Sequence, residues 1–265
     1  VESRGLGDVY KRQAHEMAHQ FGAFHTFGYE NEFEGVSSEP GSGSTIMGYA
    51  GITGSDNVQL HSDPYFHYHS LKNINDYIQN LTCHTTTFNE NEPPTVNAGN
   101  DYTIPIGTAY ELKATASDPD NQKLYYCWEQ LDSGEVGTNN FGPNFHLGSQ
   151  ARSLPPTESA VRTIPRIESV LDGNLTETNP TIGSNWETVS NIERVLTWGV
   201  TVRDYFPALA NGKGKSTSDA RILKVTSEAG PFKILSQAEE GIFWEGGSRQ
   251  IVSWDVSNTD QSPIN

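Results

Sequence analysis

Three histidines and a glutamate lie within eleven residues near the start of the chain, in HEMAHQFGAFH at positions 15–25. If residues 14–21 are helical, His15 and His19 are four residues apart and share one helical face. Two imidazoles on one face can bind a single metal ion. Glu16 then lies beside the ion, where its carboxylate can take a proton from an attacking water and pass it to a leaving amine. The spacing therefore predicts metal-assisted hydrolysis.

Gly22 comes three residues after His19 and can supply the turn that a third ligand requires. Glycine adopts positive φ at little cost and commonly ends helices, so the chain can reverse there and bring His25 to the same ion. Three protein ligands leave zinc one open position, as catalytic zinc sites require. A histidine pair alone is common on helix surfaces, but HExxHxxGxxH arises by chance in roughly one in 10^5 chains of this length.

Residues 15–25 resemble the zinc signature of the metzincin metallopeptidases, and STIMGYAG at 44–51 resembles their methionine turn. The resemblance implies that Met47 is a soft floor beneath the histidines and not a ligand. It also implies that Tyr49 reaches the zinc or the transition-state oxyanion. The alternatives are a core methionine and an aromatic residue packed in a tight turn. Within the metzincins the chain resembles the reprolysin-like secreted enzymes of bacteria, which carry β-sandwich modules behind the peptidase and act outside the cell or at its surface.

The stretch before the motif does not resemble the start of a metzincin domain. Metzincins place an upper half-domain with a mixed sheet before the active-site helix, whereas only fourteen residues precede His15. Residues 8–13 also match what a common sequencing-library transposon end encodes. We therefore interpret residues 1–13 as an artefact or non-native leader, the alternative being a short native arm. Residues 14–85 are then the lower half of the catalytic domain, in an incomplete fragment of an active parent enzyme.

The composition is acidic and narrows the range of partners. The chain has 17 Lys and Arg against 33 Asp and Glu, which gives a formal net charge of −16. This balance argues against nucleic acids and anionic membranes as partners. No apolar run approaches the length of a transmembrane helix. The length predicts about two domains, and a 10% aromatic content with dispersed Gly and Pro suits β-sandwich folds.

After the methionine turn, helical spacing predicts a closing helix that begins with Ser70 as its N-cap. Its expected apolar positions are Leu71, Ile74, Tyr77, Ile78 and Leu81. Residues 61–70 hold three more histidines. We interpret this segment as a loop that packs around Phe66, with a second metal site as the alternative. The resemblance to metzincins implies that residues 49–63 form part of the wall of the substrate pocket.

Pro93 and Pro94 mark a boundary after a linker at 86–94. Alternating segments then predict an all-β Ig-like or PKD-like sandwich over residues 95–228, with a long insertion around 140–190. Trp128 is the expected core tryptophan of a central strand. Residues 230–265 predict the start of a second β-sandwich with too few strands to close.

Two cysteines, Cys83 and Cys127, fall in different predicted domains. In the related enzymes a cysteine near residue 53 would bridge the region of Cys83, but Thr53 stands there, so Cys83 is expected to be free or to have lost its partner. Cys127 is expected to be a buried strand residue. Asp118 and Asp120 are candidate Ca²⁺ ligands, although turn chemistry alone accounts for them.

The expected fold is therefore multidomain. The C-terminal, mostly α and loop half of a metzincin α+β catalytic domain is followed by an all-β Ig-like or PKD-like sandwich and by the start of another. The expected function is zinc-dependent hydrolysis of protein or peptide substrates by a secreted protein, with surface or glycan contacts through the β modules. The alternative is an extracellular adhesion or carbohydrate-binding protein with a vestigial metal site. The intact Glu16 argues against that alternative.

Overall fold

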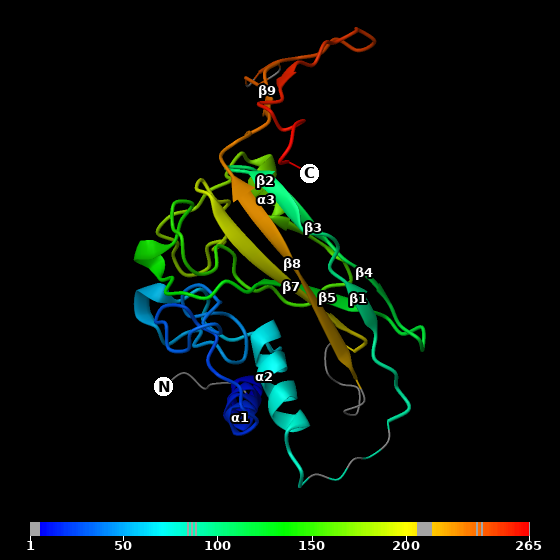
Figure 1. The fold of residues 1–265 in the computed structure, drawn as a ribbon. Helices are drawn as coiled ribbons and strands as arrows, with labels where there is room; N and C mark the ends of the chain where they lie inside the picture. The colour runs from blue at the N-terminus through cyan, green and yellow to red at the C-terminus, as the bar shows by residue number, and fades with distance from the viewer. Residues whose placement is uncertain are drawn as a thin grey trace.

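A computed structural model describes residues 6–83, 85, 87, 89–205, 214–236, 238–239 and 241–264. Three parts follow one another along the chain (Figure 1). They are an N-terminal segment of helices and loops (residues 6–83), a β region (residues 95–205 and 214–226) and a C-terminal tail (described residues between 230 and 264). Among the described residues, no helix combines the length and apolar character that crossing a membrane requires.

Helix α1 (Leu6–Gln20) carries the first two histidines of the motif and ends at the predicted glycine. Gly22 has φ +83°, and its N–H donates to the carbonyl of His19 at 3.1 Å. The N–H of Ala23 donates to the carbonyl of Ala18 at 2.9 Å. This pair of bonds is a Schellman motif, which turns the chain back towards the helix. Because α1 begins at Leu6, it includes residues interpreted above as a leader. Their origin stays a prediction.

Helix α2 (Tyr68–Gln79) starts earlier than predicted. Its N-cap is His67, whose Nδ1 accepts from the N–H of His69 at 3.2 Å. Ser70, the expected cap, is buried within the first turn instead. The prediction of a serine cap was wrong because an imidazole nitrogen in its acceptor form satisfies a helix N-terminus as a hydroxyl does. A 3-10 turn, η1 (Gly54–Asp56), interrupts the loops between the two helices.

A small core joins α1, α2 and the methionine turn. Ile74 of α2 packs against a buried cluster that consists of Ala18, Ala23, Ile46 and Met47. The apolar side chains of α2 are only partly covered, since Tyr77 and Ile78 are 44% and 39% exposed. Tyr77 instead lies against Gly22. A Cβ added at Gly22 would stand 3.0 Å from the Cβ of Tyr77. The end of α1 and the last turns of α2 are therefore in close contact.

The β region is built from open sheets. Its main sheet has the order β2-β8-β7-β5, with β2 and β8 parallel and the other pairs antiparallel. These strands are β2 (Tyr102–Pro105), β5 (Tyr125–Gln130), β7 (Arg194–Arg203) and β8 (Ser216–Thr226). The closed Ig-like or PKD-like sandwich stays a prediction.

Short antiparallel pairs flank the main sheet. They are β1 (Thr95–Asn97) with β4 (Thr115–Ser117), and β3 (Tyr110–Lys113) with β6 (Val161–Ile164). The predicted insertion contains β6 and α3 (Ile167–Leu171) and begins within the 3-10 turn η2 (Thr138–Asn140). In the tail, β9 (Lys233–Ile234) pairs with β10 (Trp254–Asp255), and Figure 1 shows the tail extending away from the main sheet.

Trp128 lies in the main core of the β region and is 3% exposed, as expected. Its strand, however, is not central. β5 is the last strand of the main sheet and forms a ladder with β7 alone. The prediction of a central strand was wrong because a buried tryptophan indicates a covered face and not a position within the sheet order.

A second core crosses from the N-terminal segment to the β region. It consists of Val58 from the former and Val136, Phe141 and Trp186 from the latter. Backbone hydrogen bonds run alongside it. Gly41 donates to Val136 at 2.7 Å, and Val136 donates to Gly28 at 2.6 Å. The loop after β5 is therefore paired with loops of the N-terminal segment. The predicted domain boundaries stay predictions.

Candidate metal centre

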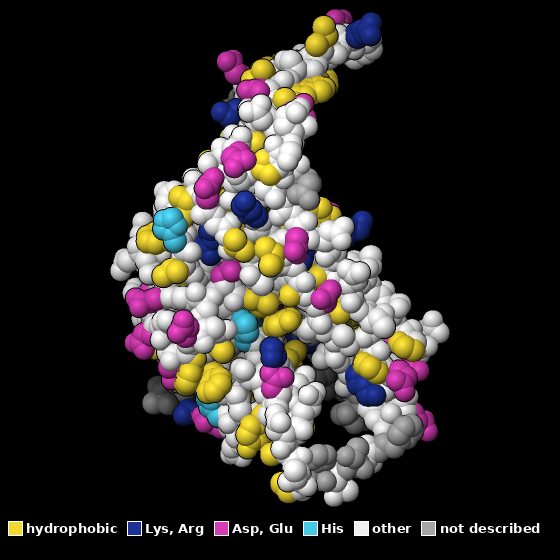
Figure 2. All heavy atoms as spheres, viewed as in Figure 1, with side chains coloured by type: hydrophobic (Ala, Val, Ile, Leu, Met, Phe, Trp, Pro, Cys, Tyr) yellow, Lys and Arg dark blue, Asp and Glu magenta, His cyan; other side chains and the backbone are white. Residues whose placement is uncertain are grey.

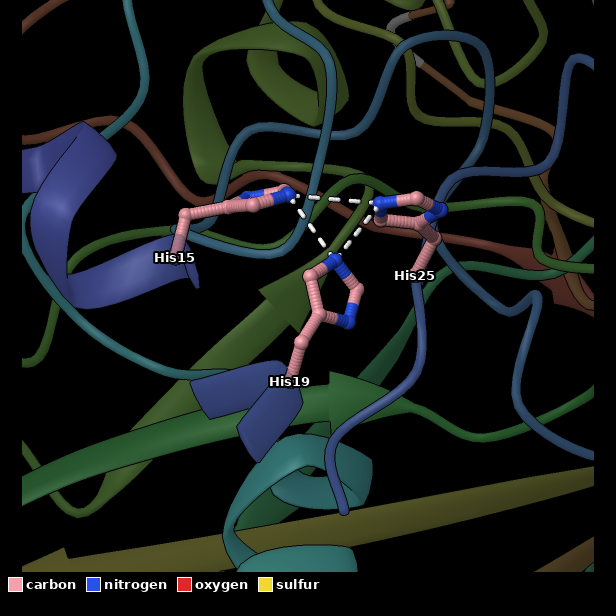
Figure 3. A group of neighbouring side chains, drawn as sticks. All are labelled: His15, His19 and His25. Atoms are coloured by element: carbon pink, nitrogen blue, oxygen red, sulfur yellow. Dashed lines mark hydrogen bonds between the residues drawn. The ribbon is translucent and has the colours of Figure 1, made fainter. Parts of the chain in front are cut away.

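The three histidines of the motif converge on one point (Figure 3). His15 and His19 project from α1, and His25 returns to them after the turn at Gly22. The Nε2 atom of His15 lies 3.2 Å from those of His19 and His25, and the latter two are 3.0 Å apart. Within the described part of the chain, no other set of three His, Cys, Asp or Glu side chains lies close enough to share an ion.

The Nδ1 atom of every ring is held by an oxygen. His15 Nδ1 lies 2.7 Å from the Ile46 carbonyl, and His19 Nδ1 lies 2.8 Å from the Ala23 carbonyl. His25 Nδ1 lies 2.7 Å from Oε2 of Glu32. Carbonyl and carboxylate oxygens only accept, so each Nδ1 donates. In neutral rings the lone pairs of the three Nε2 atoms then face one another, which is an arrangement that a cation stabilises.

The spacing of the Nε2 atoms fits zinc. Tetrahedral zinc with bonds of about 2.0–2.1 Å to nitrogen requires neighbouring nitrogens about 3.3–3.4 Å apart. The observed separations of 3.0–3.2 Å are slightly shorter. Three imidazoles are also a ligand set that zinc favours and that leaves a coordination position open. The residues present therefore fit a catalytic zinc ion.

The environment of the centre favours the metal-binding form of His15. Its pKa lies below 6.5, first because burial disfavours the charged ring and then because His19 and His25 lie nearby. The bond to the Ile46 carbonyl and the charge of Glu16 oppose this shift. A neutral imidazole binds metal without first losing a proton.

Met47 packs in the small core with residues of α1, and Tyr49 lies beside the histidine rings. Met47 is fully buried in the core below α1, and its carbonyl accepts from the N–H of Thr26, the residue after His25. The Tyr49 ring centroid lies 4.5 Å from that of His25. Burial raises the pKa of Tyr49, and the charges of Glu32 and Glu16 raise it further. The phenol therefore keeps its proton at neutral pH and can donate a hydrogen bond.

Glu16 is exposed and directly follows His15 on α1. Its charge acts on both His15 and Tyr49, so it lies near both. A carboxylate in this place can exchange protons with a substrate or water at the centre. The structure thus brings together Glu16, Tyr49 and the three histidines, although the chemical roles of these residues stay predictions.

Sequence reasoning missed Glu32, the acceptor for His25. It is one of three glutamates in YENEFE at 29–34, and no spacing rule distinguishes it from Glu30 and Glu34. It also missed Glu39, a buried carboxylate behind the methionine turn. An acidic residue in a Gly- and Ser-rich stretch was the only available signal.

The second group of histidines packs against the β region. His67 is 1% exposed, and its Nε2 lies 3.8 Å from Oε1 of Glu129. His69 Nε2 lies 3.3 Å from the carbonyl of Leu131. Burial, followed by the neighbouring His67, lowers the pKa of His69 to about 4. These two rings attach α2 to β5 and the residue that follows it.

Both cysteines are unpaired thiols, Cys83 exposed and Cys127 buried. The predicted burial of Cys127 is confirmed, since the residue is 2% exposed and its thiol donates to the carbonyl of Leu154 at 3.2 Å. Burial, with the charge of Glu129 adding to it, raises the pKa of this thiol well above its usual range. Cys127 is therefore an unreactive core residue.

Charged side chains of both signs lie on the surface. On the face that Figure 2 shows, Lys and Arg side chains are interspersed with Asp and Glu side chains.

Comparison with known proteins gives a match to a family model in the N-terminal part of the chain. Residues 3–77, which are 75 of the 265 residues, match the family model described as Metallo-peptidase family M12B Reprolysin-like. No curated protein and no solved structure matches the chain. The matched stretch contains the histidine triad, Glu16, Met47 and Tyr49. The N-terminal part of this chain is thus similar to reprolysin-like metallopeptidases, and the remainder is mostly β with open sheets.

Proposed function

We propose that the N-terminal segment carries the zinc-binding part of an endopeptidase site that hydrolyses peptide bonds in protein or peptide substrates. The observation that supports this most directly is the convergence of three Nε2 atoms whose Nδ1 partners are all oxygens. The match to a metallopeptidase family over the same residues supports it independently.

Each residue of the centre has a role that its position allows. His15, His19 and His25 would hold zinc through Nε2. When bound, zinc polarises a scissile carbonyl and activates water. Glu16 accepts a proton from the attacking water and returns it to the leaving amine. Tyr49 donates a hydrogen bond to the oxyanion that develops on the substrate.

The protein context is a further part of the proposal. We infer a secreted or cell-surface multidomain protein from the resemblance to secreted reprolysin-like enzymes. Surface or glycan contacts through the β modules are supported by exposed aromatic side chains in the tail. Phe243, Trp244 and Trp254 are 92%, 55% and 53% exposed.

Calcium is a secondary proposal for the turn that contains Asp118 and Asp120. Oδ1 of Asp118 accepts from the N–H groups of Asp120 and Gln122 at 2.9 and 3.0 Å, as turn chemistry requires. Its other oxygen, Oδ2, is buried and has no hydrogen-bond partner among the described residues. Calorimetric titration with Ca²⁺ of the chain and of its Asp118→Asn variant tests this. Equal heats for both proteins would contradict it.

The alternative class is an adhesion or carbohydrate-binding β protein whose metal motif is vestigial. Most of the described residues lie in the β region and the tail. This favours a function in which those two parts of the chain take part. The two classes differ in Glu16, which an endopeptidase requires and a vestigial site does not.

Zinc content and affinity, measured beside peptide cleavage, test the proposal. We expect one zinc per chain in the native protein and in Glu16→Ala, and its loss in His19→Ala. Cleavage of a mixed peptide library should depend on Glu16. Zinc that binds equally well to His19→Ala would contradict the site. Cleavage that survives in Glu16→Ala would contradict the mechanism.

A further inference from the structure

A buried carboxylate lies behind the metal centre and has no direct cationic partner. Glu39 is 1% exposed, and none of the ion pairs among the described residues includes it. Five neutral donors surround it instead. Burying a carboxylate is costly unless hydrogen bonds satisfy it, so these donors are what offset the cost of burying Glu39.

The donors come from two stretches of chain that flank the centre. Oε2 accepts from the hydroxyls of Thr26 and Thr45, each at 2.5 Å. Oε1 accepts from the N–H groups of Ser44 and Thr45 at 2.9 and 3.1 Å, and more weakly from the Ser44 hydroxyl at 3.4 Å. One side chain therefore joins the residue after His25 to the start of the methionine turn.

Both stretches hold groups that orient the histidines. Thr26 directly follows His25, and Thr45 directly precedes Ile46, whose carbonyl accepts from His15 Nδ1. The backbone reinforces the link, since the Glu39 N–H donates to the Thr26 carbonyl at 2.8 Å. A shift of either stretch would change the direction of one Nε2 lone pair relative to the other two.

We propose that Glu39 is a positioning residue of the metal centre. It fixes His25 and the Ile46 carbonyl relative to α1, so that the three Nε2 atoms converge before a metal arrives. This inference rests on the proposed function in one respect, namely that the histidine triad binds zinc. Losing a group that orients a ligand typically weakens metal binding 10–100-fold.

Zinc affinity and the spectrum of the cobalt-loaded chain provide the first test. Glu39→Ala should bind zinc roughly 10–100-fold more weakly in chelator competition. Its Co²⁺ form should show an altered visible absorption band, because that band reports ligand geometry. Glu39→Gln should restore most of both properties. Its amide oxygen can accept from the two N–H groups while its NH₂ donates to the two threonine hydroxyls.

The matched control is Glu187, a carboxylate that is 2% exposed and accepts from Arg162 and Arg166 in the β region. Glu187→Ala should lower the unfolding temperature but leave the zinc affinity and cobalt spectrum unchanged. A folded Glu39→Ala with native affinity and spectrum would overturn the proposal. If Glu39→Ala fails to fold, Thr26→Val removes one donor at nearly constant volume and should show a smaller loss of the same kind. Native affinity and spectrum in that variant would also overturn it.

A metal-free measurement separates this proposal from the proposed function. Nitrogen-15 NMR of the imidazole rings reports which nitrogen carries the proton. In the native chain His25 should be protonated at Nδ1 because it donates to Glu32, and in Glu39→Ala the two tautomers should mix. If the native chain and Glu39→Ala differ in the His25 tautomer but neither binds zinc, the proposed function is contradicted and the role of Glu39 is not. Identical ring signals in both proteins would contradict the role of Glu39.

Discussion

The hydroxyl of Ser44 donates a hydrogen bond of 3.0 Å to the carbonyl of Ser153, which lies 109 residues further along the chain. Ser153 in turn donates through its own hydroxyl to Glu129 on β5 at 2.5 Å and lies 2.7 Å from the hydroxyl of Tyr65. The backbone N–H of Ser44 also donates to Oε1 of Glu39 at 2.9 Å. A continuous buried polar network therefore connects the methionine turn to the main sheet.

Ser153→Ala should destabilise the N-terminal segment and the β region together. Removing the hydroxyl takes away the hydrogen bond to Oε1 of Glu129 and the one to the Tyr65 hydroxyl, which should cost about 1–3 kcal/mol. We expect one cooperative urea transition with a lower midpoint, seen alike by tryptophan fluorescence and by far-ultraviolet circular dichroism. Exposed Ser55→Ala is the control and should leave the midpoint unchanged. Two separate transitions would show that the network does not couple the regions.

Glu32→Ala should weaken zinc binding about tenfold, because it removes the acceptor that fixes the tautomer and orientation of His25. Chelator competition measures the effect. Glu34→Ala, a change of the same charge two positions later on the same exposed loop, should bind zinc as the native chain does. Equal weakening in both variants would mean that net charge, and not the bond to His25, is responsible.

Gly22→Ala should destabilise the chain more than Gly35→Ala. Both glycines have φ +83°, so both substitutions incur a backbone cost of about 1 kcal/mol. Only at Gly22 would the added Cβ meet Tyr77, at 3.0 Å, whereas at Gly35 nothing lies within 4 Å. Urea unfolding should therefore show a larger loss for Gly22→Ala, accompanied by weaker zinc binding because His25 follows the turn. Equal losses would contradict the close packing of α1 on α2.

The contribution of Glu187 to stability should depend on pH. Burial alone would raise the pKa of this carboxyl, but the Arg162 and Arg166 guanidinium groups outweigh burial and lower it. A lowered pKa in the folded state means that the stabilisation is present above the pKa of the unfolded chain and is lost as the pH falls through the folded value. Glu187→Ala should cost about 3–5 kcal/mol near neutral pH, as breaking a buried ion pair does.

In acid the difference between Glu187→Ala and the native chain should shrink. Urea midpoints measured at neutral pH and at successively lower pH test this. A difference that stays constant over the series would show that packing, and not the charge of Glu187, is lost in the variant.

The parts of the site that sequence reasoning predicted are those that local geometry determines. The placement of His15, His19 and His25 follows from helix periodicity and the turn at Gly22, all within eleven residues. The cap at His67 could not be predicted in the same way, because an imidazole accepts or donates depending on its tautomer. Tertiary packing selects the tautomer here.

Glu32 and Glu39 are parts of the site that could not be predicted from the sequence. Their partners are defined by tertiary contacts, such as the one between Glu39 and Thr26, which are 13 residues apart. The edge position of β5 likewise depends on its pairing with β7, which begins more than sixty residues later. Periodicity shows which face of an element is covered, but it does not show which element covers it.

The backbone hydrogen bonds that Val136 makes with Gly28 and Gly41 have a consequence for inheritance. Main-chain pairing of this kind depends on the length and course of both loops, and much less on their side chains. Recombination that joined this N-terminal segment to an unrelated β module would leave those main-chain groups without partners. We therefore expect recombination between genes to transfer the N-terminal segment and the β region together. Crossovers should fall before the first region or after the second, and not in the linker between them.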